Sequence, residues 1–232
     1  MELLRVTGLH AFYGESHILH GVDFTVGRGE VVILLGRNGA GRTTTLKAIL
    51  GLVGARSGSV TIDGHEAIGL PSHRIARLGV GYCPEERGIY SSLTAEENLL
   101  LPPLVAPGGM SIDDIFAMFP NLKGRSGTQG TRLSGGEQQM LAVARILRTG
   151  AKLLLLDEIS EGLAPVVVKA LSSMIHALRD KGYTIVLVEQ NFRFALPLAD
   201  RFYVMEHGRI VDGFAASELQ GKLSMLNVRL GI

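Results

Sequence analysis

The stretch GRNGAGRTT at residues 36–44 follows directly after the apolar run VVILL at 31–35. Gly36, Gly41 and Thr43 fall at the fixed offsets of the pattern G-x-x-x-x-G-K-[ST], whose glycine-rich loop holds phosphate groups. A continuous apolar run before the loop is expected of a strand that is buried on both faces. The segment after the loop predicts a helix. Strand, loop and helix in this order indicate a nucleoside-triphosphate site.

Such a loop binds phosphates mainly through its backbone. Glycines allow a tight turn in which successive N–H groups point inward at phosphate oxygens, and the helix expected at 43–50 adds its positive end. The hydroxyl of Thr43 is of the kind that binds Mg²⁺ in these loops. We therefore expect a nucleoside triphosphate to contact the following residues: Gly36, Asn38, Gly39, Ala40, Gly41, Arg42, Thr43 and Thr44.

The lysine position of the pattern holds Arg42. Lysine brings a compact charge on a thin stem, whereas arginine brings a broad planar fork, so the two are not interchangeable at such a site. By analogy with the loss of one charge-stabilising donor, a poorly seated arginine costs about 2–4 kcal/mol of transition-state stabilisation. That cost corresponds to about 10²–10³ in rate. Nucleotide binding should suffer less, because the backbone N–H groups and Thr43 remain.

A pair of acids follows a second apolar run. In AKLLLLDE, at 151–158, four leucines lead into Asp157 and Glu158. Ligands of open α/β sheets bind at the carboxyl ends of the strands, where these two carboxylates are expected. One acid can hold Mg²⁺, and the other can orient or deprotonate an attacking water molecule.

A third motif, LSGGEQQ, occupies residues 133–139. Ser134 and Glu137 fit the capping box S-x-x-E, which begins a helix. The two glycines between them also expose backbone N–H groups, and a helix start of this kind can bind an anion. The cap and an anion site are compatible.

The rest of the chain predicts an α/β fold, with a P-loop NTPase core and a mostly parallel sheet. Residues 3–13 and 18–26 predict an N-terminal antiparallel β subdomain. Proline and glycine interrupt residues 84–150, which predict a helical insertion, and the whole of 1–232 is expected to be one domain. The other expected elements are strands at 57–64, 151–158, 183–189 and, twice, within 201–213, and helices at 165–179 and ending near 199. Residues 222–232 are given no role.

Composition excludes several classes of protein. The chain has 232 residues, a net charge of +1 and a single cysteine, Cys83, so neither an intrachain disulfide nor a strongly basic nucleic-acid surface is expected. The N-terminus lacks the apolar stretch of a secretory signal. The longest apolar runs fall far short of the roughly 18 residues that a spanning helix needs. If the protein acts at a membrane, another chain must cross it.

Taken together, the three motifs resemble those of the ATP-binding subunits of ABC transporters, and the resemblance covers almost the whole chain. LSGGEQQ resembles the signature loop of that family. The resemblance implies ATP and Mg²⁺ as cofactors and a dimer of two ATPase subunits, which are the same or different. In that dimer the signature loop of one subunit closes on the γ-phosphate held by the P-loop of the other. The implied signature contacts are Ser134, Gly135, Gly136 and Gln138.

The resemblance assigns roles to further residues. Tyr13 matches the aromatic residue that stacks on adenine, Asp157 the acid on the Mg²⁺ side, and Glu158 the catalytic base. Residues 160–164, SEGLA, match a loop that crosses the dimer interface. Glu85 stands where most members carry a glutamine that contacts Mg²⁺ and the transmembrane subunit. Gln190 stands where most members carry a histidine on the γ-phosphate; its amide can bind phosphate but cannot carry a proton.

These departures, with Ile159 in the place of a commoner proline, resemble one branch of the family, the ATPases of branched-chain amino acid importers. The resemblance implies a bacterial subunit that lies peripherally on the cytoplasmic face of the inner membrane. Its expected partners are transmembrane permease subunits and a second ATPase subunit, with a periplasmic solute-binding protein as an indirect partner. No nucleic-acid partner is expected.

Two alternatives stay open. Arg42 and Gln190 are compatible with a subunit that binds nucleotide, hydrolyses it weakly or not at all, and supports a partner ATPase, although an intact Glu158 speaks against this. The solute itself is not encoded in an ATPase subunit, so amides or urea could replace amino acids. A soluble ABC protein that acts on nucleic acid is disfavoured by the lack of a basic excess.

Overall fold

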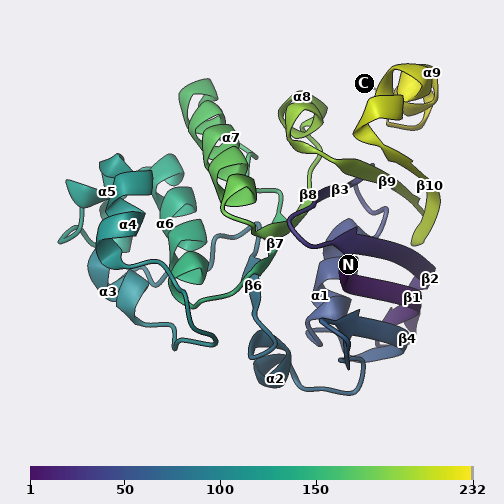
Figure 1. Cartoon of the computed structure of the whole chain (residues 1–232), viewed down its shortest axis with the longest axis horizontal. Helices are drawn as coiled ribbons and strands as arrows, with labels where there is room; N and C mark the ends of the chain where they lie inside the picture. The colour runs from purple at the N-terminus through teal and green to yellow at the C-terminus, as the bar shows by residue number, and fades with distance from the viewer. Residues whose placement is uncertain (231–232) are drawn as a thin grey trace.

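A six-stranded sheet forms the centre of the protein, in the order β10-β9-β3-β8-β7-β6 (Figure 1). The computed structural model describes residues 1–230. All neighbours in this sheet are parallel except β9 and β10, which form an antiparallel pair. Its strands are β3 (Val31–Gly36), β6 (Val80–Cys83), β7 (Leu153–Asp157), β8 (Thr184–Val188), β9 (Arg201–Glu206) and β10 (Arg209–Ala215).

The central strand β3 is buried on both faces, as its continuous apolar sequence predicts. Alternate residues of a strand point to opposite faces. Val31, Ile33 and Leu35 accordingly belong to one hydrophobic core, and Val32 and Leu34 belong to another. The strand that leads into the glycine-rich loop is therefore fixed from two sides.

A second, four-stranded antiparallel sheet forms the N-terminal part, in the order β2-β1-β4-β5. Its strands are β1 (Glu2–Tyr13), β2 (Ser16–Gly27), β4 (Ala55–Ile62) and β5 (His65–Glu66). Helix α1 (Arg42–Ile49) shares the second core with this sheet through Leu46 and Ile49. The strand expected at 57–64 ends at Ile62, because Asp63 and Gly64 take left-handed conformations in the turn to β5.

The chain between β6 and β7 is helical and gathers at the left of Figure 1, away from the antiparallel sheet at the right. It holds α3 (Ala95–Leu100), α4 (Ile112–Met118), α5 (Pro120–Lys123), a short 3-10 helix (Gly130–Arg132) and α6 (Gly135–Arg148). Three of these helices begin with a capping box, in which a serine or threonine and an acid three residues later bond each other's backbone N–H. The cap residues are Thr94, Ser111 and Ser134.

The remaining helices are α2 (Ser72–Ala76), α7 (Pro165–Asp180), α8 (Phe192–Ala195) and α9 (Leu219–Leu230), with short 3-10 helices at Leu196–Leu198 and Ala216–Glu218. The expectation of a helix ending near 199 is wrong in its length. Helix α8 ends at Ala195, since Pro197 lacks the N–H that another helical turn needs. Within residues 1–230 no helix is long and apolar enough to cross a membrane.

Of the segment 222–232, to which the sequence assigned no role, residues 222–230 lie in α9, and 231–232 lie outside the described residues. Leu226 is fully buried in the first core, and Arg229 donates to Glu206 of β9 over 2.6 Å. The end of the described chain is therefore docked on the sheet beside β9 and β10 (Figure 1).

Glycine at position 136 is required by packing. A Cβ atom there would lie 2.7 Å from Cγ2 of Val167 in α7, whereas one at Gly135 would meet only the flexible guanidinium of Arg87, at 3.4 Å. We predict that Gly136→Ala lowers the free energy of unfolding by about 1–3 kcal/mol through overpacking. Gly135→Ala, the matched control, should be neutral or stabilising, because alanine favours a helix by about 1 kcal/mol over glycine. Urea unfolding measures the free energy of unfolding of both variants. Equal stabilities would contradict the predicted packing requirement at Gly136.

Candidate nucleotide-binding site

The glycine-rich loop joins β3 to α1 in the order that the sequence predicts. Gly41, the residue before the helix, has a φ of 104°, and a Cβ atom there would lie 2.9 Å from Cδ2 of Leu19. Only glycine is suited to this position. The loop is also tied from outside, because the N–H of Gly208 donates to the carbonyl of Ala40 over 2.9 Å.

A cavity of about 430 Å³ opens over this loop. It brings together Tyr13 at the end of β1, the loop and helix start at 38–44, and Glu85 after β6. Its remaining lining comes from Ile18, Glu158, Glu161 and Gln190. The ring of Tyr13 is 44% exposed at the mouth of the cavity, which leaves an aromatic face accessible to a base.

Asp157 lies below the cavity and is held by two hydroxyl groups. Thr43 Oγ1 donates to Asp157 Oδ1 over 2.9 Å, and Tyr82 Oη donates to Asp157 Oδ2 over 3.2 Å. Burial raises the pKa of Asp157, and the two hydrogen bonds oppose that change. Burial likewise raises the pKa of the Tyr82 phenol, so it stays a donor. The sequence analysis missed Tyr82, although it lies in the strand next to β7.

The oxygens of Thr43, Asp157 and Glu85 fit Mg²⁺, which prefers hard oxygen ligands and keeps several water molecules and phosphates. Burial, followed by the neighbouring acids Glu161 and Asp157, raises the pKa of Glu85. A cation beside these acids would relieve their repulsion. Among residues 1–230 no group of three or more His, Cys, Asp or Glu is placed to hold a metal by itself. A Mg²⁺ ion here thus depends on nucleotide phosphates and water for its other ligands.

Arg42 lines the cavity, and its guanidinium is bonded to residues that follow the strands β7 and β8. Its Nη2 atom lies 2.8 Å from Glu158 Oε1, and its Nη1 atom donates to the main-chain carbonyl of Glu189 over 2.7 Å. Arg42 is 4% exposed and Glu158 is 8% exposed, so this ion pair is buried. The broad fork of arginine is therefore seated on two protein acceptors in the free chain, with a forked geometry that a lysine does not reproduce.

Glu158 carries several signs of a constrained functional group. Its φ is +47°, in the left-handed region that non-glycine residues rarely adopt. Burial, followed by the adjacent Glu161, raises its pKa to about 7, whereas Arg42 and Gln190 oppose the rise. Gln190 Nε2 donates to Glu158 Oε2 over 2.6 Å. A carboxylate with a pKa near neutrality is suited to act as a general base.

The residues of LSGGEQQ do not line the cavity over the loop. Ser134 is exposed and caps α6, and Gly136 is buried against Val167 of α7. The side chain of Gln138 is engaged within the helical segment, because its Nε2 donates to the carbonyl of Gly130 and its Oε1 accepts from Arg87. In the single chain, the helix start at 134–138 and the glycine-rich loop are therefore separate surfaces.

The sequence did not single out Glu189 or its contact with Ser160, which was expected only as part of the loop at 160–164. Glu189 is buried with 2% exposure, and its carboxylate accepts hydrogen bonds from both the N–H and the hydroxyl of Ser160. The signal available was an acid at the end of a predicted buried strand, directly before Gln190. That pattern is common at strand ends and does not reveal which loop the acid contacts.

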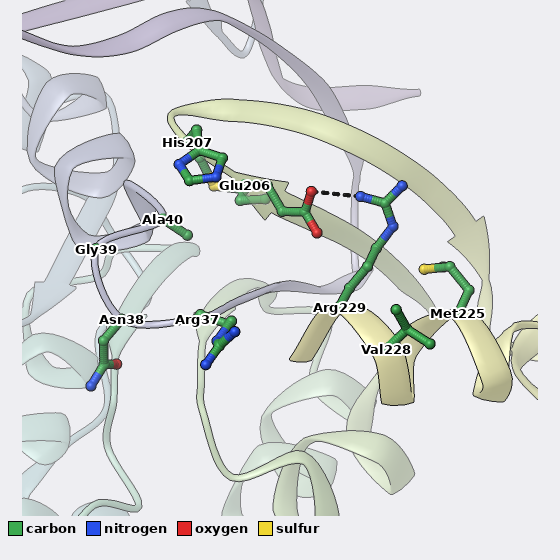
Figure 2. Close-up of a pocket in the computed structure, with 10 residues that line it drawn as sticks. Arg37, Asn38, Gly39, Ala40, Glu206, His207, Met225, Val228 and Arg229 are labelled. Carbon is green, nitrogen blue, oxygen red and sulfur yellow. Dashed lines mark hydrogen bonds and ion pairs between the residues drawn. The ribbon is translucent and has the colours of Figure 1, made fainter. Parts of the chain in front are cut away.

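A larger cavity, of about 860 Å³, lies on another side of the glycine-rich loop and shares Asn38, Gly39 and Ala40 with the first. Figure 2 shows its wall of α9 residues, where Glu206 is bound to Arg229. Its lining lacks the acids of the smaller cavity. The smaller cavity therefore has the chemistry of a hydrolytic site.

The chain is similar in sequence to known ATP-binding proteins of transporters. A family model described as "ABC transporter" matches residues 19–161. The chain is 44% identical over 212 residues to the high-affinity branched-chain amino acid transport ATP-binding protein BraG of Pseudomonas aeruginosa, covering 90% of this chain and 91% of that protein. It is 38% identical over 221 residues to the probable branched-chain amino acid transport ATP-binding protein LivF of Archaeoglobus fulgidus, covering 94% of each.

The fold also matches solved structures. A crystal structure of a nucleotide-free ATP-binding cassette from an ABC transporter superposes with a TM-score of 0.85 at 25% identity. The match covers 100% of this chain and 99% of that one.

We predict that Arg42→Lys raises the kcat for ATP by about 10²-fold, because the compact ammonium group lacks the two-armed contact of the guanidinium with Glu158 and the carbonyl of Glu189 and is freer to meet phosphate. Arg42→Ala, which removes the charge, should lower kcat instead. Steady-state turnover at saturating ATP measures both. An unchanged rate in Arg42→Lys would show that the native arginine already serves the reaction.

The raised pKa of Glu158 predicts a pH dependence. A base acts in its ionised form, and kcat/KM reports the pKa values of the free enzyme, so kcat/KM should be nearly full at pH 8 and fall about tenfold for each pH unit below about 7. The dissociation constant of ATP should change much less over this range, because the backbone N–H groups of the loop do not titrate. A kcat/KM that is flat from pH 6 to pH 8 would exclude Glu158 as the titrating group.

Proposed function

This chain belongs to the ABC transporter family, and on that premise we propose that it powers the import of branched-chain amino acids. As an ABC-type ATPase it couples the hydrolysis of ATP to transport. The choice of solute is supported above all by two relatives named for branched-chain amino acid transport, which match over 90% and 94% of the chain. ATPase subunits of this family do not contact the solute, so the solute must be established by experiment.

We assign the chemistry to the smaller cavity. Tyr13 would stack on adenine, the backbone of 38–41 would hold the phosphates, and Glu158 would activate the attacking water molecule. When bound, Mg²⁺ would neutralise phosphate charge, with Thr43, Asp157 and Glu85 as its protein ligands. Gln190, already bonded to Glu158, would orient the γ-phosphate through its amide.

In this site the carboxylate of Glu158 and the triphosphate would compete for the guanidinium of Arg42. In the free chain its guanidinium is paired with the carboxylate of Glu158. A triphosphate in the cavity carries more negative charge and would attract the same guanidinium. Movement of Arg42 toward phosphate would leave Glu158 free to act as a base, so binding and activation would be linked.

The glycine-rich loop and the start of α6 lie on separate surfaces of the chain, which supports a proposal about its partners. Since the start of α6 does not face the glycine-rich loop of its own chain, we propose that Ser134, Gly135, Gly136 and Gln138 serve the site of a second ATPase subunit, identical or different. Residues 84–150 would form the helical subdomain that meets transmembrane permease subunits. The chain would then lie on the cytoplasmic face of the membrane, with a solute-binding protein acting on the far side.

One observation favours a second candidate function. The buried pair of Arg42 and Glu158 holds the base in the free chain, as would suit a subunit that binds ATP, turns it over slowly and supports a partner ATPase. The intact base and the adjacent Gln190 favour turnover, so we place this candidate second.

Glu158→Gln separates these candidates. The amide keeps the size of the side chain but cannot accept a proton, so kcat should fall by about 10²–10⁴-fold. ATP binding should persist, because the phosphates contact the loop. Turnover and nucleotide binding are measured on the transporter reconstituted with its permease. A rate equal to wild type would exclude Glu158 as the base and favour the supporting role.

The solute is tested in vesicles that hold the permease subunits co-purified with this chain, together with their solute-binding protein. Leucine, isoleucine or valine should stimulate ATP hydrolysis and accumulate inside the vesicles. Amides and urea are the comparison solutes. Stimulation by these alone would overturn the assignment to branched-chain amino acids while leaving the ATPase itself intact.

A further inference from the structure

The buried carboxylate of Glu189 accepts two of its three hydrogen bonds from Ser160, in the loop that follows Glu158. Glu189 accepts from the N–H of Ser160 at 3.0 Å, from its hydroxyl at 2.9 Å, and from the N–H of Asn191 at 3.4 Å. Glu189 and Ser160 are 2% and 3% exposed. A carboxylate is expensive to bury unless hydrogen bonds satisfy it, so this contact specifies one position for the loop after Glu158.

The same strand end holds Glu158 from the other side. The N–H of Glu158 donates to the carbonyl of Val188 over 2.9 Å, and Gln190 Nε2 donates to the Glu158 carboxylate over 2.6 Å. The carbonyl of Glu189 binds Arg42. Three successive residues at the end of β8 thus contact Glu158, its ion-pair partner and the loop that follows it.

The backbone of Glu158 needs such support. Its φ of +47° is disfavoured for a residue with a Cβ atom, and such conformations persist only where the surroundings fix them. Val188 fixes the chain at Glu158 itself, and Ser160 is fixed two residues further on. Without the Ser160 contact, the turn could relax to an ordinary conformation and the carboxylate of Glu158 would change its direction.

We propose that Glu189 is a positioning residue for ATP hydrolysis, whose carboxylate holds Ser160 and so keeps Glu158 in its left-handed conformation and aimed into the cavity. Glu189 does not line the nucleotide cavity and acts only through Glu158. The inference rests on the proposed role of Glu158 as the base. A small hollow of about 290 Å³, lined by Glu158, Ser160 and Glu189 among others, leaves room for the turn to relax.

The test uses Glu189→Ala, Glu189→Gln, Ser160→Ala and the double variant Ser160→Ala/Glu189→Ala, each in the assembled transporter. Burial raises the pKa of Glu189 to about 7, so assays are run at pH 8, where the carboxylate is ionised. Displacement of a catalytic group by about 1 Å can cost 10²-fold, and we expect Glu189→Ala to lower kcat by about that factor. The dissociation constant of ATP should stay within about threefold, since no phosphate contact is lost.

The other variants show whether the effect passes through Ser160. Glu189→Gln retains an oxygen for the Ser160 N–H and should recover kcat to within about tenfold of wild type. Ser160→Ala removes only the hydroxyl donor and should lower kcat several-fold. Because the two residues act through one contact, the double variant should be no slower than Glu189→Ala alone.

Glu66→Ala is the matched control. Glu66 accepts from a serine hydroxyl and two backbone N–H groups, of Ser59, Val60 and Ile68, but lies in the antiparallel sheet. Its loss should lower thermal stability and leave kcat unchanged. If Glu189→Ala does not fold, the inference is tested by the kcat values of Glu189→Gln and Ser160→Ala.

A kcat within twofold of wild type in Glu189→Ala, additive effects in the double variant, or a fall in kcat matched by an equal loss of ATP binding would each overturn the inference. Glu158→Gln distinguishes the proposed role of Glu158 as the base from the proposed role of Glu189. Normal turnover in that variant would overturn both. Turnover lost in Glu158→Gln but kept in Glu189→Ala would remove only the inference.

Discussion

The burial of β3 on both faces is the constraint on which the site depends. Odd-numbered residues of this strand pack into one core and even-numbered residues into the other, so a shift in its register would disturb the packing of both cores. The glycine-rich loop begins where this strand ends, and the parallel strands β7 and β8 bring their carboxyl ends to the same edge. Phosphate-binding amides and acidic side chains are thereby brought together before any nucleotide binds.

Charge at that edge is balanced within the protein. Glu158 and Glu189 are both buried, and each has its pKa raised to about 7. Arg42 contacts both residues: it pairs with the carboxylate of Glu158 and donates to the main-chain carbonyl of Glu189. An arginine in the lysine position is thus a structural part of the free site. Its planar fork spans two acceptors, and its movement toward phosphate would link nucleotide binding to release of the proposed base.

In the dimer proposed above, the chain would contribute half of each of two sites. The start of α6 is capped and its Gly136 is packed on α7, so its accessible groups are Ser134 and the half-buried Gly135. These groups belong to a surface separate from the glycine-rich loop. A site that needs both surfaces requires a second subunit, and in this way ATP can act as the contact that joins two chains.

The sequence by itself determined the α/β fold, the glycine-rich loop, the acids after β7 and the family, because these depend on local order and on burial that a run of apolar residues records. It also placed Tyr13, Glu85, Glu158 and Gln190 among the candidates, and tertiary structure gathers them around one cavity. It could not give the partners of Arg42, which come from residues 116 and 147 positions away. Nor could it give the Ser160–Glu189 contact, the hydroxyl of Tyr82 on Asp157, or the docking of α9. Local patterns record which residues are apolar or can turn, but hydrogen bonds between distant strand ends exist only once parallel strands have aligned their carboxyl ends.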